Sequence, residues 1–125
     1  MILVDTSVWI DRFRASEPYL VQLIDDESAL THPFIIGEFV LGSFKQRASV
    51  IEWLRDMTMA LKADDEEVME MIETHRLFGL GIGYIDAHLL ACVRLTGGTR
   101  LWTRDKRLSA AAVSMGIGIA AETQH

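Results

Sequence analysis

Short runs of apolar residues alternate with longer segments in which apolar residues recur at helical spacing. The first run, Ile2-Leu3-Val4, is apolar at every position, as in a strand that is covered on both faces. Similar runs predict further strands at residues 29–31, 59–61, 101–103 and 117–119. Strands that alternate with helices form a parallel sheet with helices on both faces. We therefore expect an α/β fold, a three-layer α/β/α sandwich around a central parallel sheet.

The predicted helices fill most of the chain between these runs. They cover residues 8–14, 17–26, 33–44, 50–57, 64–77, 84–96 and 105–115. Helical spacing also predicts which side chains of two helices face inward: Val68, Met69 and Ile72 in residues 64–77, and Ile85, Leu89 and Cys92 in residues 84–96.

Size and composition are those of an ordinary globular protein. The 125 residues fit one domain over residues 1–125, and 50% hydrophobic with 24% charged residues excludes wholesale disorder. Cys92 is the single cysteine, which excludes an intramolecular disulfide framework and fits a reducing cytoplasm. Asp5 interrupts the apolar start, and Asp86 and His88 interrupt the longest apolar run. We therefore expect a cytoplasmic protein with no membrane span.

The net charge of −6 and the pI of about 5.1 argue against a simple basic module that binds phosphates. They do not exclude a nuclease whose acidic site is neutralised by bound cations.

Four carboxylates stand at unusual positions. Asp5 and Asp105 directly follow predicted strands, Asp86 opens an apolar helix, and Glu38 lies in a helix that is apolar nearly all round. Each has a structural explanation as well, because the three aspartates could cap helices and Glu38 could pair with an arginine. The carboxyl ends of parallel strands meet at one edge of a sheet, and right-handed crossovers bring helix N-terminal halves there. We therefore expect the four side chains to converge.

Converging carboxylates repel one another unless a divalent cation lies among them. Oxygen ligands without cysteine or histidine suit Mg²⁺, with Mn²⁺ as a substitute, and the four histidines show no metal-binding spacing. Such an ion orients a phosphodiester, lowers the pKa of a bound water and neutralises charge on the attacking and leaving oxygens. The ion, rather than a lysine, then meets the scissile phosphate.

Four segments resemble the PIN domain, and the overall pattern is similar to the VapC toxins of bacterial toxin–antitoxin pairs. The segments are VDTSVWID at 4–11, IGEF at 36–39, YIDAHLLA at 84–91 and LWTRDKRL at 101–108. The resemblance implies a three-layer α/β/α fold and a Mg²⁺-dependent endoribonuclease. It also implies catalytic and metal-binding roles for Asp5, Glu38, Asp86 and Asp105, with supporting hydroxyls from Ser7 and Thr103. A homodimer and a cognate VapB-type antitoxin are implied by the resemblance alone.

On this hypothesis, water attacks the RNA phosphorus in line and leaves a 5′-phosphate and a 3′-hydroxyl. Basic residues near the predicted edge are candidates for contacts with the RNA backbone, although solvated helix charge explains each of them at least as well. They are Arg12, Arg14, Arg104 and Arg107.

Other function classes fit the sequence less well. The glycines at 79, 81 and 83 do not follow a strand and lack the spacing of a dinucleotide loop, so we interpret them as a turn that delivers Asp86. A phospho-receiver domain needs an acidic pair after the first strand, but Thr6 follows Asp5. A haloacid-dehalogenase-type phosphatase needs an aspartate where Ser7 stands. A non-catalytic binding module that acts through protein partners remains an alternative.

Overall fold

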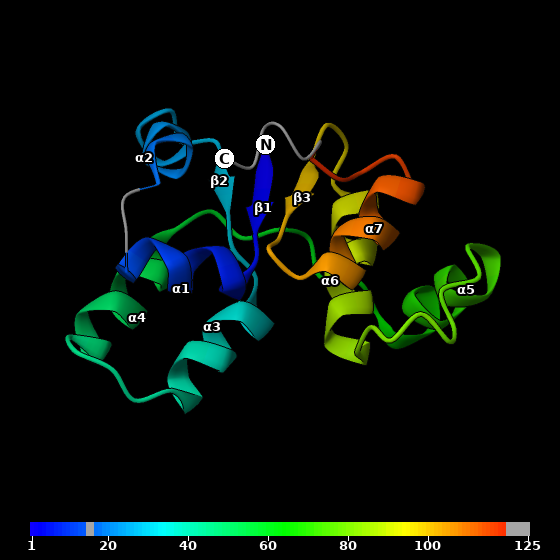
Figure 1. The fold of residues 1–125 in the computed structure, drawn as a ribbon, viewed down its shortest axis with the longest axis horizontal. Helices are drawn as coiled ribbons and strands as arrows, with labels where there is room; N and C mark the ends of the chain where they lie inside the picture. The colour runs from blue at the N-terminus through cyan, green and yellow to red at the C-terminus, as the bar shows by residue number, and fades with distance from the viewer. Residues whose placement is uncertain (15–16, 120–125) are drawn as a thin grey trace.

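The computed structural model describes residues 1–14 and 17–119. Its centre is a parallel sheet with the strand order β2-β1-β3, in which β1 is Ile2–Val4, β2 is Ala29–Leu30 and β3 is Arg100–Trp102 (Figure 1). Leu3 in the central strand pairs with Leu30 on one side and Leu101 on the other. The buried β1 needs cover on both faces, which confirms the α/β class predicted from its apolar run.

The two remaining predicted strands take part in the sheet only through single bridges. Thr31 pairs in parallel with Met59, and Leu101 pairs in parallel with Gly118. Residues 59–61 and 117–119 therefore extend the sheet outward beyond β2 and β3, but the pairing is too short to make full strands.

Seven helices surround the sheet in the part of the chain that the structure describes. They are α1 (Thr6–Arg14), α2 (Pro18–Asp25), α3 (Pro33–Leu41), α4 (Arg47–Asp56), α5 (Asp65–Thr74), α6 (Tyr84–Leu95) and α7 (Lys106–Ser114). Figure 1 shows α1 to α4 on one side of the strands and α5 to α7 on the other, which agrees with the predicted sandwich. No helix within the described residues is long and apolar enough to cross a membrane.

Several helix bounds differ from the predicted ones, among them the start of α4 at Arg47 and the end of α5 at Thr74, and three details are wrong in ways that bear on packing. Helix α3 ends at Leu41 rather than at residue 44, because Gly42 takes an extended conformation. In α5 Val68 faces inward as predicted, but its buried partner is Met71, whereas Met69 is 56% exposed. In α6 every residue from Ala87 to Val93 is buried, but Ile85 lies in the first turn and is exposed. Periodicity identified these helices correctly but not the full set of residues that face the core.

Candidate active site at the carboxyl edge of the sheet

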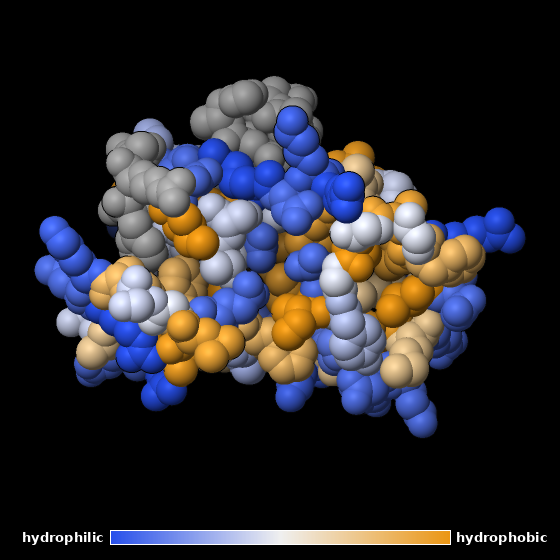
Figure 2. All heavy atoms as spheres, turned by 60° about the horizontal axis from the view of Figure 1, so that its bottom comes forward, coloured by the Kyte–Doolittle hydropathy of each residue, from blue (hydrophilic) through white to orange (hydrophobic). Residues whose placement is uncertain are grey.

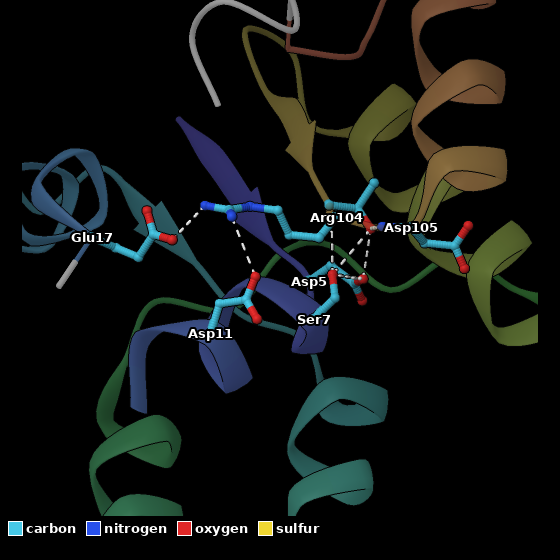
Figure 3. A network of polar contacts seen from close by, with 7 residues as sticks. Asp5, Ser7, Asp11, Glu17, Arg104 and Asp105 are labelled. Atoms are coloured by element: carbon cyan, nitrogen blue, oxygen red, sulfur yellow. Dashed lines mark hydrogen bonds and ion pairs between the residues drawn. The ribbon is translucent and has the colours of Figure 1, made fainter. Parts of the chain in front are cut away.

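Asp5 is the most buried of the four predicted site carboxylates. It follows β1 directly, and its backbone N–H donates to the carbonyl of Trp102 in β3, with 2.9 Å between nitrogen and oxygen. Its side-chain oxygen Oδ2 accepts a hydrogen bond of 2.9 Å from Ser7 Oγ and one of 2.8 Å from Thr103 Oγ1 (Figure 3). The residue is only 7% exposed, so these bonds fix the carboxylate at the edge of the sheet.

The two hydroxyls that hold Asp5 are themselves held by the backbone of the loop after β3. The backbone N–H of Arg104 donates to Ser7 Oγ at 2.9 Å, and that of Asp105 donates to Thr103 Oγ1 at 3.1 Å. Because each hydroxyl oxygen accepts from the backbone, its proton is available for Asp5. The loop therefore orients the carboxylate through two parallel chains of hydrogen bonds.

Asp105 and Asp86 each use one carboxylate oxygen at the start of a helix. Asp105 Oδ1 accepts from the backbone N–H groups of Arg107 and Leu108 at 2.9 and 3.1 Å, and so caps α7. Asp86 Oδ2 accepts from the N–H of Gly83 at 3.2 Å before α6. Capping is thus a real role of both residues, and it leaves the second oxygen of each carboxylate for other contacts.

Glu38 differs from its predicted setting. It was expected on a helix that is apolar nearly all round, but α3 is not covered on its outer face, where Glu38 is exposed and Leu41 is 89% exposed. The carboxylate also has no predicted arginine partner among the described ion pairs. Instead Thr6 Oγ1 donates to Glu38 Oε1 at 3.2 Å, which links α3 to the residue next to Asp5.

Electrostatic interactions connect these four carboxylates, which we call the acid cluster. Although the Glu38 side chain is exposed to solvent, partial desolvation of its carboxylate by the surrounding protein raises its pKa; the Thr6 hydrogen bond opposes the shift, and the charges of Asp5 and Asp86 add to it. Partial burial likewise raises the pKa of Asp86, opposed by the Gly83 N–H and increased by Asp5 and Asp105. Glu38 therefore lies in the fields of Asp5 and Asp86, and Asp86 in the fields of Asp5 and Asp105. None of the four carboxylates takes part in an ion pair among the described residues.

The acid cluster fits a hard divalent cation in its donor chemistry and in its charge. All four ligand candidates offer carboxylate oxygens, and a doubly positive ion would offset the repulsion that adds to the raised pKa of Glu38 and Asp86. Within residues 1–14 and 17–119, however, no three carboxylate, imidazole or thiol groups stand close enough together to share an ion. Binding therefore requires carboxylates of the acid cluster to move toward one another.

The buried histidine closest in sequence to the acid cluster is engaged elsewhere. His88 Nε2 lies 3.1 Å from Asp65 Oδ1, and the same oxygen accepts a hydrogen bond of 2.8 Å from the Tyr84 hydroxyl. These contacts join α6 to α5 and give the His88 imidazole a structural role.

The predicted basic residues lie in different surroundings. The Arg104 guanidinium donates to Asp11 Oδ2 and Glu17 Oε1. The side chain of Arg107 is exposed and lies against Gly81, where an added Cβ would stand 2.5 Å from its Nη1. The side chains of Arg12 and Arg14 are outside the described part of the chain. Contacts of these arginines with RNA stay predictions.

An apolar hollow of about 310 Å³ adjoins the acid cluster at Thr6 and Glu38. Ile10, Phe39 and Phe44 supply its apolar walls. The surface below the sheet in Figure 1, turned forward in Figure 2, carries hydrophobic patches beside hydrophilic ones.

Two contacts at this site have no signal in the sequence. The Thr6–Glu38 bond joins residues 32 positions apart, and the Arg104–Glu17 pair joins residues 87 positions apart. The position of Arg104 between Thr103 and Asp105 marks it as close to the site, but only the fold shows that its charge is directed at carboxylates.

Comparison with known families identifies the fold and its type. The family model for the PIN domain matches residues 2–114, which contain the whole acid cluster and both supporting hydroxyls. The chain belongs to the PIN domain family. It is also 48% identical over 122 residues to ribonuclease VapC32 of Mycobacterium tuberculosis, in the strains CDC 1551 / Oshkosh and ATCC 25618 / H37Rv. The match covers 98% of this chain and 98% of each relative, so this is a PIN protein of the VapC type.

Proposed function

We propose that this VapC-type PIN protein is a metal-dependent endoribonuclease and the toxin of a toxin–antitoxin pair. The observation that carries the proposal is the setting of Asp5, a buried carboxylate that two hydroxyls hold at the sheet edge within the field of the other acids. The ribonuclease name of its relatives, which match nearly the full chain, supports RNA as the substrate.

We assign the metal to the acid cluster, with Asp5, Asp86 and Asp105 as ligands and Glu38 completing the set directly or through water. When bound, Mg²⁺ or Mn²⁺ would orient the phosphodiester, lower the pKa of an attacking water and neutralise charge on the leaving oxygen. Ser7 and Thr103 act on Asp5: their hydrogen bonds to Oδ2 restrict its rotation and keep the carboxylate oriented. The expected products carry a 5′-phosphate and a 3′-hydroxyl.

The partners in this proposal are RNA, a VapB-type antitoxin and a second copy of the chain. Exposed apolar side chains on α3 and α4, among them Leu41 and Trp53, offer surface for a protein contact. We leave the division of this surface between antitoxin and second copy to experiment.

Cleavage of end-labelled RNA by purified protein tests the proposal. Wild type with Mg²⁺ should give fragments with 5′-phosphate ends, and EDTA or Asp5→Asn should abolish cleavage. A 2′,3′-cyclic phosphate product, full activity in EDTA, or activity that survives Asp5→Asn would refute the mechanism. If wild type binds a divalent cation and protein partners without cutting RNA, the non-catalytic binding module becomes the better explanation.

A further inference from the structure

Arg104 connects three segments at the edge of the sheet. Its guanidinium donates to Asp11 Oδ2 in α1 at 3.2 Å and to Glu17 Oε1, next to the start of α2, at 2.5 Å. It also lies 5.7 Å from the centre of the Trp102 ring in β3. Figure 3 shows the side chain reaching away from Asp105 toward these two carboxylates.

The ion pair with Glu17 is largely removed from water. The Glu17 side chain is 11% exposed and that of Arg104 is 29% exposed. Glu17 is the residue before the first turn of α2, yet its carboxylate makes no capping hydrogen bond and is directed at Arg104 instead. Removing one partner of such a pair leaves the other charge poorly solvated and unbalanced.

The backbone of Arg104 belongs to the support of Asp5. Its N–H donates to Ser7 Oγ at 2.9 Å, and Ser7 Oγ donates to Asp5 Oδ2. Arg104 therefore has two roles: its side chain is bound by Asp11 and Glu17, and its backbone N–H orients Ser7.

We propose that Arg104 is a positioning residue: the carboxylates of Asp11 and Glu17 hold its side chain so that its backbone N–H keeps Ser7, and through Ser7 the carboxylate of Asp5, in the reactive orientation. The inference rests on the proposed ribonuclease function for its kinetic consequence. It assigns Arg104 a role different from contact with the RNA backbone, because two carboxylates already bind the guanidinium and would repel a phosphate.

Kinetic analysis of four variants and one control variant separates these roles. Arg104→Gln and Arg104→Lys remove or weaken the paired contacts, Glu17→Gln and Asp11→Asn neutralise one partner each, and Arg94→Gln, at the far end of α6 from Asp86, serves as the matched arginine control. A displaced catalytic group costs on the order of 100-fold in rate, so kcat of Arg104→Gln should fall by about that factor. KM and its salt dependence should stay as in wild type. Glu17→Gln should show a smaller loss in the same direction, and Arg94→Gln none.

Two kinetic outcomes overturn the inference. The first is a raised KM with a weaker salt dependence and an unchanged kcat in Arg104→Gln, which is the behaviour of a residue that contacts RNA phosphates. The second is an unchanged kcat in both Arg104→Gln and Glu17→Gln. Glu17→Gln preserves side-chain shape and so keeps the test valid if Arg104→Gln fails to fold.

Amide hydrogen exchange provides a readout that does not depend on activity. In Glu17→Gln and Asp11→Asn, the Arg104 N–H should exchange faster than in wild type, while the amides of α6 keep their protection. Unchanged exchange at Arg104 would overturn the inference even if wild type proved not to cleave RNA. Conversely, faster exchange in a protein without ribonuclease activity would support the positional link and refute only the proposed function.

Discussion

The hydroxyl of Thr103 donates a hydrogen bond of 2.8 Å to Oδ2 of Asp5, across 98 positions of sequence. The bond joins the residue after β3 to the residue after β1, so it forms only when the two strands pair in their correct register. The orientation of the Asp5 side chain therefore depends directly on the pairing of β1 with β3.

Replacing Thr103 with valine preserves the shape of the side chain and removes this hydrogen bond. The Asp5 carboxylate then loses a donor and the Asp105 N–H loses its acceptor. An unsatisfied buried partner costs about 1–3 kcal/mol in unfolding free energy. Loss of a residue that supports a ligand lowers metal affinity or activity by about 10- to 100-fold. Urea denaturation and RNA cleavage rates measure the two effects.

Thr103→Ser retains the hydroxyl and is the control for that experiment. It should keep most of the activity, with a stability loss limited to the missing methyl group. Equal activity of the valine and serine variants would show that the hydroxyl does not orient Asp5.

His32 should make stability depend on pH. Its ring is fully buried, its Nδ1 accepts from the Phe34 N–H at 2.9 Å, and its Nε2 has no hydrogen-bond partner among the described residues. Burial, with smaller contributions from nearby His88 and Lys62, lowers the pKa of His32 from 6.5 to about 4. Between pH 6.5 and about 4, His32 is protonated in the unfolded chain but stays neutral in the folded chain. The free energy of unfolding therefore declines as the pH falls through this range.

The size of this decline follows from the pKa difference and reaches roughly 3 kcal/mol for a single group. His32→Asn keeps an acceptor for the Phe34 N–H but does not titrate, so it should flatten the profile between pH 6.5 and 4. A variant profile as steep as that of wild type would assign the acid sensitivity to other groups.

Gly81 and Gly79 form a matched pair for testing Arg107. Both have positive φ angles, +78° and +75°, so alanine at either position strains the backbone by roughly 1–2 kcal/mol. An added Cβ at Gly79 meets nothing within 4 Å, whereas at Gly81 it displaces the flexible end of Arg107. Both variants should lose similar stability, but only Gly81→Ala should weaken RNA binding if Arg107 contacts RNA. Equal affinities in filter-binding assays would remove Arg107 from the RNA contacts.

Asp86→Asn should stabilise the metal-free protein and abolish its response to metal. The pKa of Asp86 is raised by burial and by Asp5 and Asp105, so its ionised form is disfavoured in the folded state. At neutral pH the neutral asparagine relieves that cost and retains an acceptor for the Gly83 N–H. The variant should therefore melt at a higher temperature than wild type in EDTA, and the difference should disappear at acid pH, where Asp86 is protonated. A lower melting temperature in EDTA would contradict the inferred repulsion.

The fold could be predicted because β1 and β2 are apolar at every position, β3 carries the buried Leu101 and Trp102, and the helices have regular spacing. The prediction of core-facing residues failed where apolar side chains lie on neighbouring faces of one helix. In α5, Val68 and Met71 face the core, and the apolar Met69 does not. It also failed for Glu38, because apolar sequence in α3 does not imply that the helix is covered, and Leu41 is nearly fully exposed.

The places of Asp5, Asp86 and Asp105 after strands and at helix starts could be predicted from the sequence, and their role as metal ligands stays a prediction. Their support could not, because it depends on pairs that only the sheet brings together. Nothing in the spacing indicates that Arg104 selects Glu17 and Asp11 rather than solvent or RNA, since 87 and 93 positions separate them. Such contacts follow from strand register and helix placement, not from local pattern.

Calorimetric titration of Mn²⁺ into the purified protein tests the central claim, that the acid cluster is a divalent-cation site. Wild type should bind Mn²⁺, and saturation to 100 times Kd should raise its unfolding free energy by about 2.7 kcal/mol. Asp5→Asn should not bind, whereas Asp64→Asn, which keeps an acceptor for the Glu67 N–H at the start of α5, should bind as wild type does. Binding of Mn²⁺ by Asp5→Asn with wild-type affinity, or none by wild type, would contradict the account.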